Sequence, residues 1–224
     1  GSFNTALGTS ALENNTTASY NTAVGYNAGT AVTTGINNTL IGGLAGDALT
    51  VGSVNIAIGK QALTGDTKGS NSVAIGFQAL EAQNFTTATD AYNVAVGSKA
   101  GESVTTGTFN TLIGGLAGDA LTDADKNTAI GYAALGADTL GSLSTAVGRM
   151  ALTSQNFTTA TDTYNVAVGH NAGLLVTTGV NNTLIGGLAG DAITTGGSNV
   201  ALGTSALTSN TTASNNTAVG YQAG

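Results

Sequence analysis

Few side chains of this sequence have the type and spacing that catalysis requires. The only histidine, His170, follows a glycine at a position that elsewhere holds Thr, Tyr, Lys, Phe, Ser, Arg or Gly, so we interpret it as a solvent-facing residue. No serine lies in a nucleophile elbow, and no carboxylates recur at the fixed spacing of a glycosidase pair. The chain has no cysteine, which excludes disulfides and thiolate metal sites. We therefore expect neither enzymatic activity nor a cofactor.

Two segments resemble calcium-binding loops without completing one. Residues 123–127 begin like an EF-hand loop, but its sixth position needs Gly and its twelfth an acid, where this chain has Thr128 and Ala134. Residues 42–47 are one position out of step with the calcium-binding nonapeptide of β-rolls. No Lys-Ser or Lys-Thr pair follows these glycines, so a phosphate loop is not expected either. We expect no metal site, and a Ca²⁺-dependent solenoid remains an alternative.

Two polar segments of identical sequence, 83–90 and 155–162, are the candidates for ligand binding. Each lies in a repeat that is four residues longer than the others. Extra residues in a repeat protein are extruded as loops, commonly on the binding face. A phenylalanine flanked by Asn and Thr can stack on a sugar ring while its neighbours bind hydroxyl groups, which predicts a glycan ligand. The alternative is that each phenylalanine only fills a gap against the next subunit. The candidate residues are Asn84, Phe85, Thr86, Asn156, Phe157 and Thr158.

These segments interrupt a short repeat that runs from end to end of the chain. It reads Asn, two or three apolar or β-branched residues, Gly, two variable positions and Ala, as in residues 38–45. Its thirteen copies are evenly spaced, except that the steps into the two long coils are four positions longer than the rest. This period predicts a solenoid, in which each coil buries its apolar side only against its neighbours, so that residues 1–224 form one domain. The anchoring glycines are Gly8, Gly25, Gly42, Gly59, Gly76, Gly97, Gly114, Gly131, Gly148, Gly169, Gly186, Gly203 and Gly220.

Each coil carries a short β-branched strand just before its glycine. The ordinary 17-residue period is too short for a strand and a crossover helix, which predicts an all-β, parallel β-solenoid. The repeated glycine indicates a positive φ or the close approach of the neighbouring coil. Asn stands four residues before the glycine in every coil except at Ser72 and Ser144, and we expect these Asn residues to form a hydrogen-bonded ladder. A Thr column eight residues after the glycine runs parallel to it.

One exchange predicts a narrow interior. The residue four after the glycine is Leu or Gly, and a large apolar residue appears three positions later only where it is Gly, as in Gly29 with Val32. Where it is Leu, the later residue is polar, as in Leu12 with Asn15. Dense packing explains this exchange if both positions point into one pocket with room for one large side chain.

The narrow interior predicts oligomerisation. A coil with so little apolar area to bury gains stability when part of its surface is covered by another subunit. Alanine is fixed three residues after the glycine and frequent two residues before it. We expect these small residues to let subunits approach closely, so that Ala74→Glu or Ala129→Glu abolishes assembly.

Composition excludes several partners. Charged residues are 8% of the chain and the net charge is −7, with no basic stripe for nucleic acid. No apolar run is long enough to insert into a membrane. Gly1-Ser2 resembles the remnant of a cloning site, so we interpret the chain as a segment of a longer protein.

The strand motif resembles that of a known family. Asn21–Gly25, Ser72–Gly76 and Asn165–Gly169 are similar to the head repeats of YadA-type trimeric autotransporter adhesins, and more so to phage-like tail-fibre repeats with an Asn-Thr-Thr turn such as Asn210–Thr212. The resemblance implies a left-handed β-roll, a homotrimer, an extracellular location on a bacterial surface or virion fibre, and attachment to a cell-surface glycan or protein receptor. Ice binding remains an alternative, since it also favours uncharged, Thr-rich solenoids.

Overall fold

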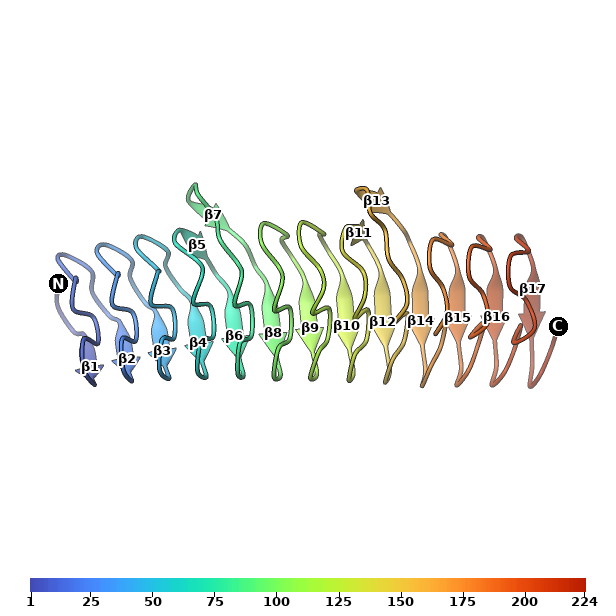
Figure 1. Cartoon of the computed structure of the whole chain (residues 1–224), viewed down its shortest axis with the longest axis horizontal. Helices are drawn as coiled ribbons and strands as arrows, with labels where there is room; N and C mark the ends of the chain where they lie inside the picture. Colours follow the sequence, from blue (N-terminus) through green and yellow to red (C-terminus); the bar gives the residue numbers. More distant parts are fainter.

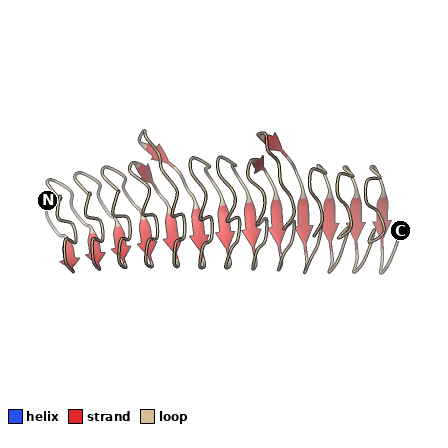
Figure 2. Ribbon diagram, in the orientation of Figure 1, coloured by secondary structure: helices blue, strands red, loops and turns tan.

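The protein is an elongated parallel β-solenoid of thirteen coils. The computed structural model describes all residues 1–224 and contains strands and turns but no helix (Figures 1 and 2). One strand of three residues per coil joins a single thirteen-stranded parallel sheet. These strands are β1 (Thr5–Leu7), β2 (Thr22–Val24), β3 (Thr39–Ile41), β4 (Ile56–Ile58), β6 (Val73–Ile75), β8 (Val94–Val96), β9 (Thr111–Ile113), β10 (Thr128–Ile130), β12 (Thr145–Val147), β14 (Val166–Val168), β15 (Thr183–Ile185), β16 (Val200–Leu202) and β17 (Thr217–Val219).

The sheet is in register from end to end. Strand β2 pairs with β3 so that Thr22 faces Thr39 and Val24 faces Ile41, and every other pair of the sheet aligns its residues in the same way. Figure 1 shows the arrows side by side in one direction along the whole rod. At about 4.8 Å per coil, the stack is about 60 Å long. The predicted all-β, parallel β-solenoid is thus confirmed.

The central residue of each strand points inward and the two flanking residues point outward. The central residue, such as Ala23 or Leu40, is fully buried, whereas the flanking Thr22 and Val24 are half-buried on the outer surface. The alanine three residues after each glycine is interior as well: Ala28 has no exposed surface.

The expectation that alanines contact a neighbouring subunit is therefore wrong. Ala74 and Ala129 are both fully buried in their own chain. A glutamate at either position would place a charge in the closed interior and break the coil itself, so these substitutions do not test assembly.

The interior pocket beside the residue four after each anchoring glycine has room for one large side chain. A Cβ atom added to Gly29 would lie 3.1 Å from Leu12 Cδ2, 3.4 Å from Val32 Cγ2 and 2.6 Å from Leu40 Cδ1. The Leu and the later Val thus fill the same space from neighbouring coils, which confirms the predicted exchange. The core is a thin column of Ala with one or two Leu, Val or Ile residues in nearly every coil, the second being a central strand residue such as Leu40.

The predicted Asn ladder is present, the Thr column forms a second ladder, and both bind backbone atoms. The backbone N–H of Asn38 donates to Oδ1 of Asn21 at 2.8 Å, and Nδ2 of Asn21 donates to the carbonyl of Gly35 at 2.8 Å. Each Asn thus stitches its coil to the next at two points. In the Thr column, the Thr33 hydroxyl donates to the carbonyl of Thr50 at 3.2 Å. The hydroxyl hydrogens of the Thr column therefore form hydrogen bonds within the chain.

The anchoring glycines meet both conditions that the sequence suggested. Their φ angles lie between 128° and 142°. A Cβ atom on Gly114 would lie 2.5 Å from the carbonyl oxygen of Gly131 in the next coil. No other residue fits this position without moving two coils apart.

We predict that Gly114→Ala destabilises the protein by about 3 kcal/mol or more, because strained backbone and a clash with the next coil add together. The neighbouring Gly115 is a matched control: it has no positive φ, and its nearest contacts to an added Cβ are at 3.7 Å and beyond. Gly115→Ala should stay within about 0.5 kcal/mol of the parent protein. Urea unfolding followed by circular dichroism measures both, and equal stabilities would contradict the assignment.

Candidate functional site

The two long coils form projecting loops on the same side of the rod, as predicted. The first carries β7 (Thr89–Asp90), which pairs with β5 (Gly69–Ser70) of the preceding coil. The second carries β13 (Thr161–Asp162), which pairs with β11 (Gly141–Ser142). Figure 1 shows β7 and β13 standing beyond the outline of the other coils.

The phenylalanines of these loops are not available for stacking on a ligand. Phe85 and Phe157 are only 5% and 7% exposed, and their own chain covers them. Phe85 packs over Gly69, where an added Cβ would lie 2.9 Å from Cδ2 of the ring. Both sequence interpretations, an exposed ring and a ring against the next subunit, are corrected by this burial.

The polar neighbours of the phenylalanines remain open. Asn84, Thr86, Asn156 and Thr158 are all exposed. The Oδ1 atoms of the two Asn side chains accept hydrogen bonds from Thr hydroxyls of the preceding coils, at 3.1 Å in the first loop and 3.3 Å in the second. Their amide hydrogens stay free to bind a ligand.

A buried carboxylate lies beneath each loop. Asp66 is fully buried and accepts hydrogen bonds from Gln83 Nε2 at 2.6 Å and from the backbone N–H groups of Gly69 (2.9 Å) and Phe85 (3.3 Å). A carboxylate is tolerated in an apolar interior only when it is hydrogen-bonded in this way. The network joins the loop to the coil before it and makes the loop a rigid part of the rod.

The second loop repeats the arrangement. Asp138 accepts hydrogen bonds from Gln155 at 2.5 Å, Gly141 at 3.1 Å and Phe157 at 3.0 Å. The contacts of the first network thus recur at the second long coil, and sequence reasoning assigned neither network.

These networks explain the two gaps in the Asn ladder. Gln83 Nε2 donates to the Ser72 hydroxyl at 3.0 Å, and Gln83 Oε1 accepts from Asn93 at 2.9 Å. The short serine leaves space for the glutamine, which bridges the ladder in its place. Asp, Ser, Gln and the four extra residues occur together at both long coils, and this coincidence was the sequence signal for a single structural unit.

A second candidate surface is the outward side of the main sheet, which we call the outer strip. It consists of the first and third residues of the thirteen main-sheet strands, and all twenty-six are Thr, Val, Ile or Leu. Ile41, Ile113 and Ile185 remain 36–37% exposed. Aligning the coils in the sequence placed these residues in columns. It did not reveal that their side chains point outward.

Exposed aromatic residues border the outer strip. Nine of the eleven aromatic residues stand two positions before or two positions after a strand, and all nine are exposed. Tyr92 and Phe109 stack with ring centroids 5.5 Å apart. The nine residues are Phe3, Tyr20, Tyr26, Phe77, Tyr92, Phe109, Tyr132, Tyr164 and Tyr221.

Negative charge is confined to other parts of the coil. None of the twelve acidic residues lies on the outer strip or its aromatic borders. Six stand five residues after an anchoring glycine, and here partial burial raises the pKa of Asp119 and of Asp191. A hydrogen bond to Glu102, at 2.8 Å, raises the pKa of Lys99. The six are Glu13, Asp47, Glu81, Glu102, Asp119 and Asp191.

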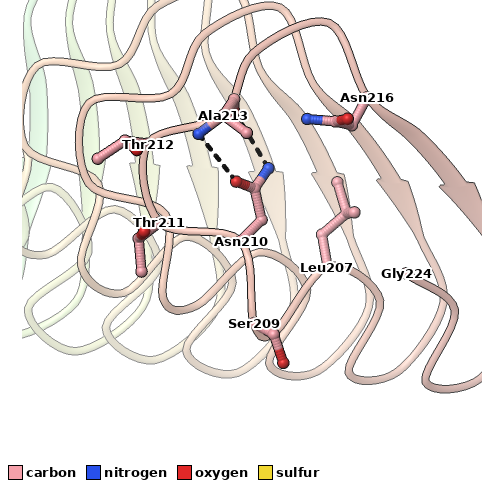
Figure 3. Close-up of a pocket in the computed structure, with 8 residues that line it drawn as sticks. All are labelled: Leu207, Ser209, Asn210, Thr211, Thr212, Ala213, Asn216 and Gly224. Carbon is pink, nitrogen blue, oxygen red and sulfur yellow. Dashed lines mark hydrogen bonds between the residues drawn. The ribbon is translucent and has the colours of Figure 1, made fainter.

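The only pocket is a hollow on the uncovered side of the last coil (Figure 3). Its centre is Asn210, whose side chain exchanges hydrogen bonds of 3.1 and 3.2 Å with the backbone of Ala213. No charged side chain lines it. Its central polar side chain is thus already paired with the backbone of its own coil.

The comparisons with known proteins identify no relative. No family model matches the chain, and neither does any curated protein or solved structure. The structure contains no helix long and apolar enough to cross a membrane. It brings no three His, Cys, Asp or Glu side chains together as a metal site.

We predict that Gln83→Ala costs about 2–3 kcal/mol, because it removes a hydrogen bond from a buried carboxylate. Asn84→Ala is the control, since this neighbour is exposed and should change stability by less than about 0.5 kcal/mol. Thermal and urea unfolding compare the two variants. If Gln83→Ala is as stable as Asn84→Ala, the network does not hold the loop.

Asp119 gives a prediction about pH. Its pKa is raised in the folded protein by burial and then by Glu102, so ionisation of this group opposes folding. The destabilisation is present above the folded pKa and vanishes below the unfolded value of about 3.9. Asp119→Asn should therefore raise the melting temperature slightly at pH 7 and not at pH 3, with solvent screening keeping the gain small. The same gain at both pH values would contradict this assignment.

Proposed function

We propose that this chain is a structural and adhesive segment of a homotrimeric surface fibre, such as a bacterial adhesin or a phage-like tail fibre, and that it acts outside the cell. The observation that carries the proposal is a rod of constant cross-section bearing two rigid loops on one side. A left-handed winding and a role in attachment without catalysis belong to the same proposal.

A rod of this kind can hold two points at a fixed distance and carry a pulling force along its axis. Every coil is bound to the next by the sheet, and most coils also by the Asn ladder and the Thr ladder, as Asn38 and Thr33 illustrate. No coil is skipped in the main sheet, so the rod has no hinge. A segment of this kind holds the parts before and after it at a fixed separation.

The two loops present polar side chains that can bind a ligand. They are four coils apart, which corresponds to about 19 Å along the rod. A trimer would carry six loops in two rings, so that weak individual contacts gain from avidity. The open residues Asn84, Thr86, Asn156 and Thr158 offer amide and hydroxyl groups to a cell-surface glycan or protein receptor.

A loop-free variant tests this role. Replacing residues 80–93 by a copy of residues 101–110, and residues 152–165 by a copy of 173–182, turns both long coils into ordinary ones. The accompanying changes Asp66→Asn, Asp138→Asn, Ser72→Asn and Ser144→Asn remove the carboxylates and restore the ladder.

We expect the loop-free variant to keep its circular dichroism spectrum and to lose binding to a glycan array and to a panel of fixed cells. Variants that lack only one loop should bind with intermediate avidity. Undiminished binding without either loop would reject the loops as contact sites.

The assembly is tested separately by sedimentation. We predict that the parent protein sediments as three chains of 21.7 kDa each. A stable, folded single chain at micromolar concentration would refute the homotrimer.

A further inference from the structure

The exposed residues of the two loops are identical although their surroundings differ. Residues 68–82 lead into the first loop and residues 140–154 into the second, and eight of these fifteen positions differ. The loop segments 83–90 and 155–162 differ at no position, although only two of the eight residues in each segment are buried. Packing of the interior does not dictate exposed side chains, so their identity points to a contact outside the chain.

The aspartate at the end of each loop occurs only in the long coils. Seven residues before the anchoring glycine, all eleven ordinary coils have Gly or Ala, whereas the two long coils have Asp90 and Asp162. Both carboxylates are exposed. Asp90 accepts a hydrogen bond from Nδ2 of Asn71 at 2.9 Å, but Leu143 stands in the place of Asn71 at the second loop. The two acids therefore do not serve a common contact within the chain.

An exposed tyrosine follows each aspartate by two residues. Tyr92 and Tyr164 are 49% and 56% exposed, and their φ angles of 50° and 49° are nearly equal. The residues between each aspartate and its tyrosine, Ala91 and Thr163, are fully buried. Side chains two residues apart in an extended segment lie on the same side, about 7 Å from each other. The carboxylate and the tyrosine ring can therefore contact one small ligand together.

We propose that the aspartate and the tyrosine of each loop together bind a neutral sugar residue of a cell-surface glycan. The inference rests on the attachment role proposed for the loops, and it adds the class of the ligand and the residues that contact it. One face of a sugar ring carries C–H groups that pack on an aromatic ring, and the sugar hydroxyls donate hydrogen bonds to a carboxylate. Tyr92 and Tyr164 thus supply the stacking surface that the buried phenylalanines cannot supply.

Charge favours an uncharged sugar over an acidic one. The carboxylate of a sialic acid, or a sulfate group, would meet Asp90 or Asp162 at close range on a chain of net charge −7. Lys68 lies in the coil before the first loop and can offset this repulsion, but Leu140 takes its place before the second loop. A ligand that binds both loops alike therefore cannot depend on this lysine.

The first site is held in place by the neighbouring coils. Tyr92 stacks on Phe109 of the next coil, with ring centroids 5.5 Å apart and 19° between the ring planes. Asn71 of the preceding coil orients Asp90, and the pairing of β7 with β5 fixes the backbone between the loop and the tyrosine. The second site shares the strand pairing, through β13 and β11. Groups that are fixed before binding avoid the entropic cost of being ordered by the ligand.

A pair of tyrosine substitutions tests the site on an array of neutral, sialylated and sulfated glycans. We expect the parent protein to bind neutral glycans, and Tyr92→Ala with Tyr164→Ala to weaken this binding about tenfold, because both stacking surfaces are lost. Tyr26→Ala with Tyr132→Ala is the matched control. These tyrosines are 60% and 53% exposed and stand directly after anchoring glycines, so binding should change less than about twofold. Equal loss in both double variants, or loss in neither, overturns the inference.

The aspartates give an independent readout, because they can be changed at nearly constant side-chain volume. Asp90→Asn with Asp162→Asn should also weaken binding about tenfold, since a neutral acceptor replaces a charged one. Asp123→Asn, at an exposed acid outside the loops, is the control and should leave binding unchanged. Tyr92→Phe with Tyr164→Phe keeps the rings and should retain most of the binding. Full binding by the double aspartate variant overturns the inference.

Circular dichroism and sedimentation separate a lost site from a lost fold. If the folded alanine variant no longer sediments like the parent protein, the two tyrosines form a subunit contact and the inference is overturned. If that variant does not fold, the aspartate variant decides. A parent protein that binds only sialylated or sulfated glycans, or that attaches to cells through its loops without binding any glycan, overturns the inference and leaves the attachment role in place. Binding to neither glycans nor cells rejects both.

Discussion

The close stacking of successive coils is the constraint on which the rest of the structure depends. At each anchoring glycine that has a coil after it, the carbonyl of the next coil occupies the space where a side chain would begin, as at Gly114 and Gly131. With this contact fixed at every step, coils cannot slip or tilt relative to one another. Each residue therefore meets its counterpart in the next coil, and columns of Asn and Thr become ladders. The rod is straight because the same contact recurs along its whole length.

Close stacking also makes the interior narrow, which decides where apolar side chains can go. One large residue fills each shared pocket, so that Gly29 must be small where Leu12 and Val32 approach it. The strand then buries its alanine and turns Val24 and its equivalents outward. The surplus of aliphatic side chains on the outside follows from the size of the interior.

The structural features that depend on the repeat period could be predicted from the sequence. The repeat period identifies which residues lie next to each other in neighbouring coils, and so the glycine contact, the Asn ladder and the shared pocket were all predictable. It does not identify which side of a strand faces inward when both sides are apolar. For that reason the prediction that Ala74 and Ala129 face a neighbouring subunit was wrong. Phe85 was misplaced because the four extra residues have no counterpart elsewhere in the repeat. Its burial depends on the fold of the loop over Gly69.

The loops show how a regular stack accommodates a local irregularity. An insertion breaks the Asn ladder, and a broken ladder leaves backbone groups without partners in the interior. Gln83 restores the bridge and Asp66 ties the returning backbone of the loop to the coil before it. The second unit, around Gln155 and Asp138, uses the same contacts although the residue after its Thr ladder position is Leu140 in place of Lys68. The network therefore tolerates a change from Lys68 to Leu140 at this half-buried position beside the loop, because its contacts lie in the interior.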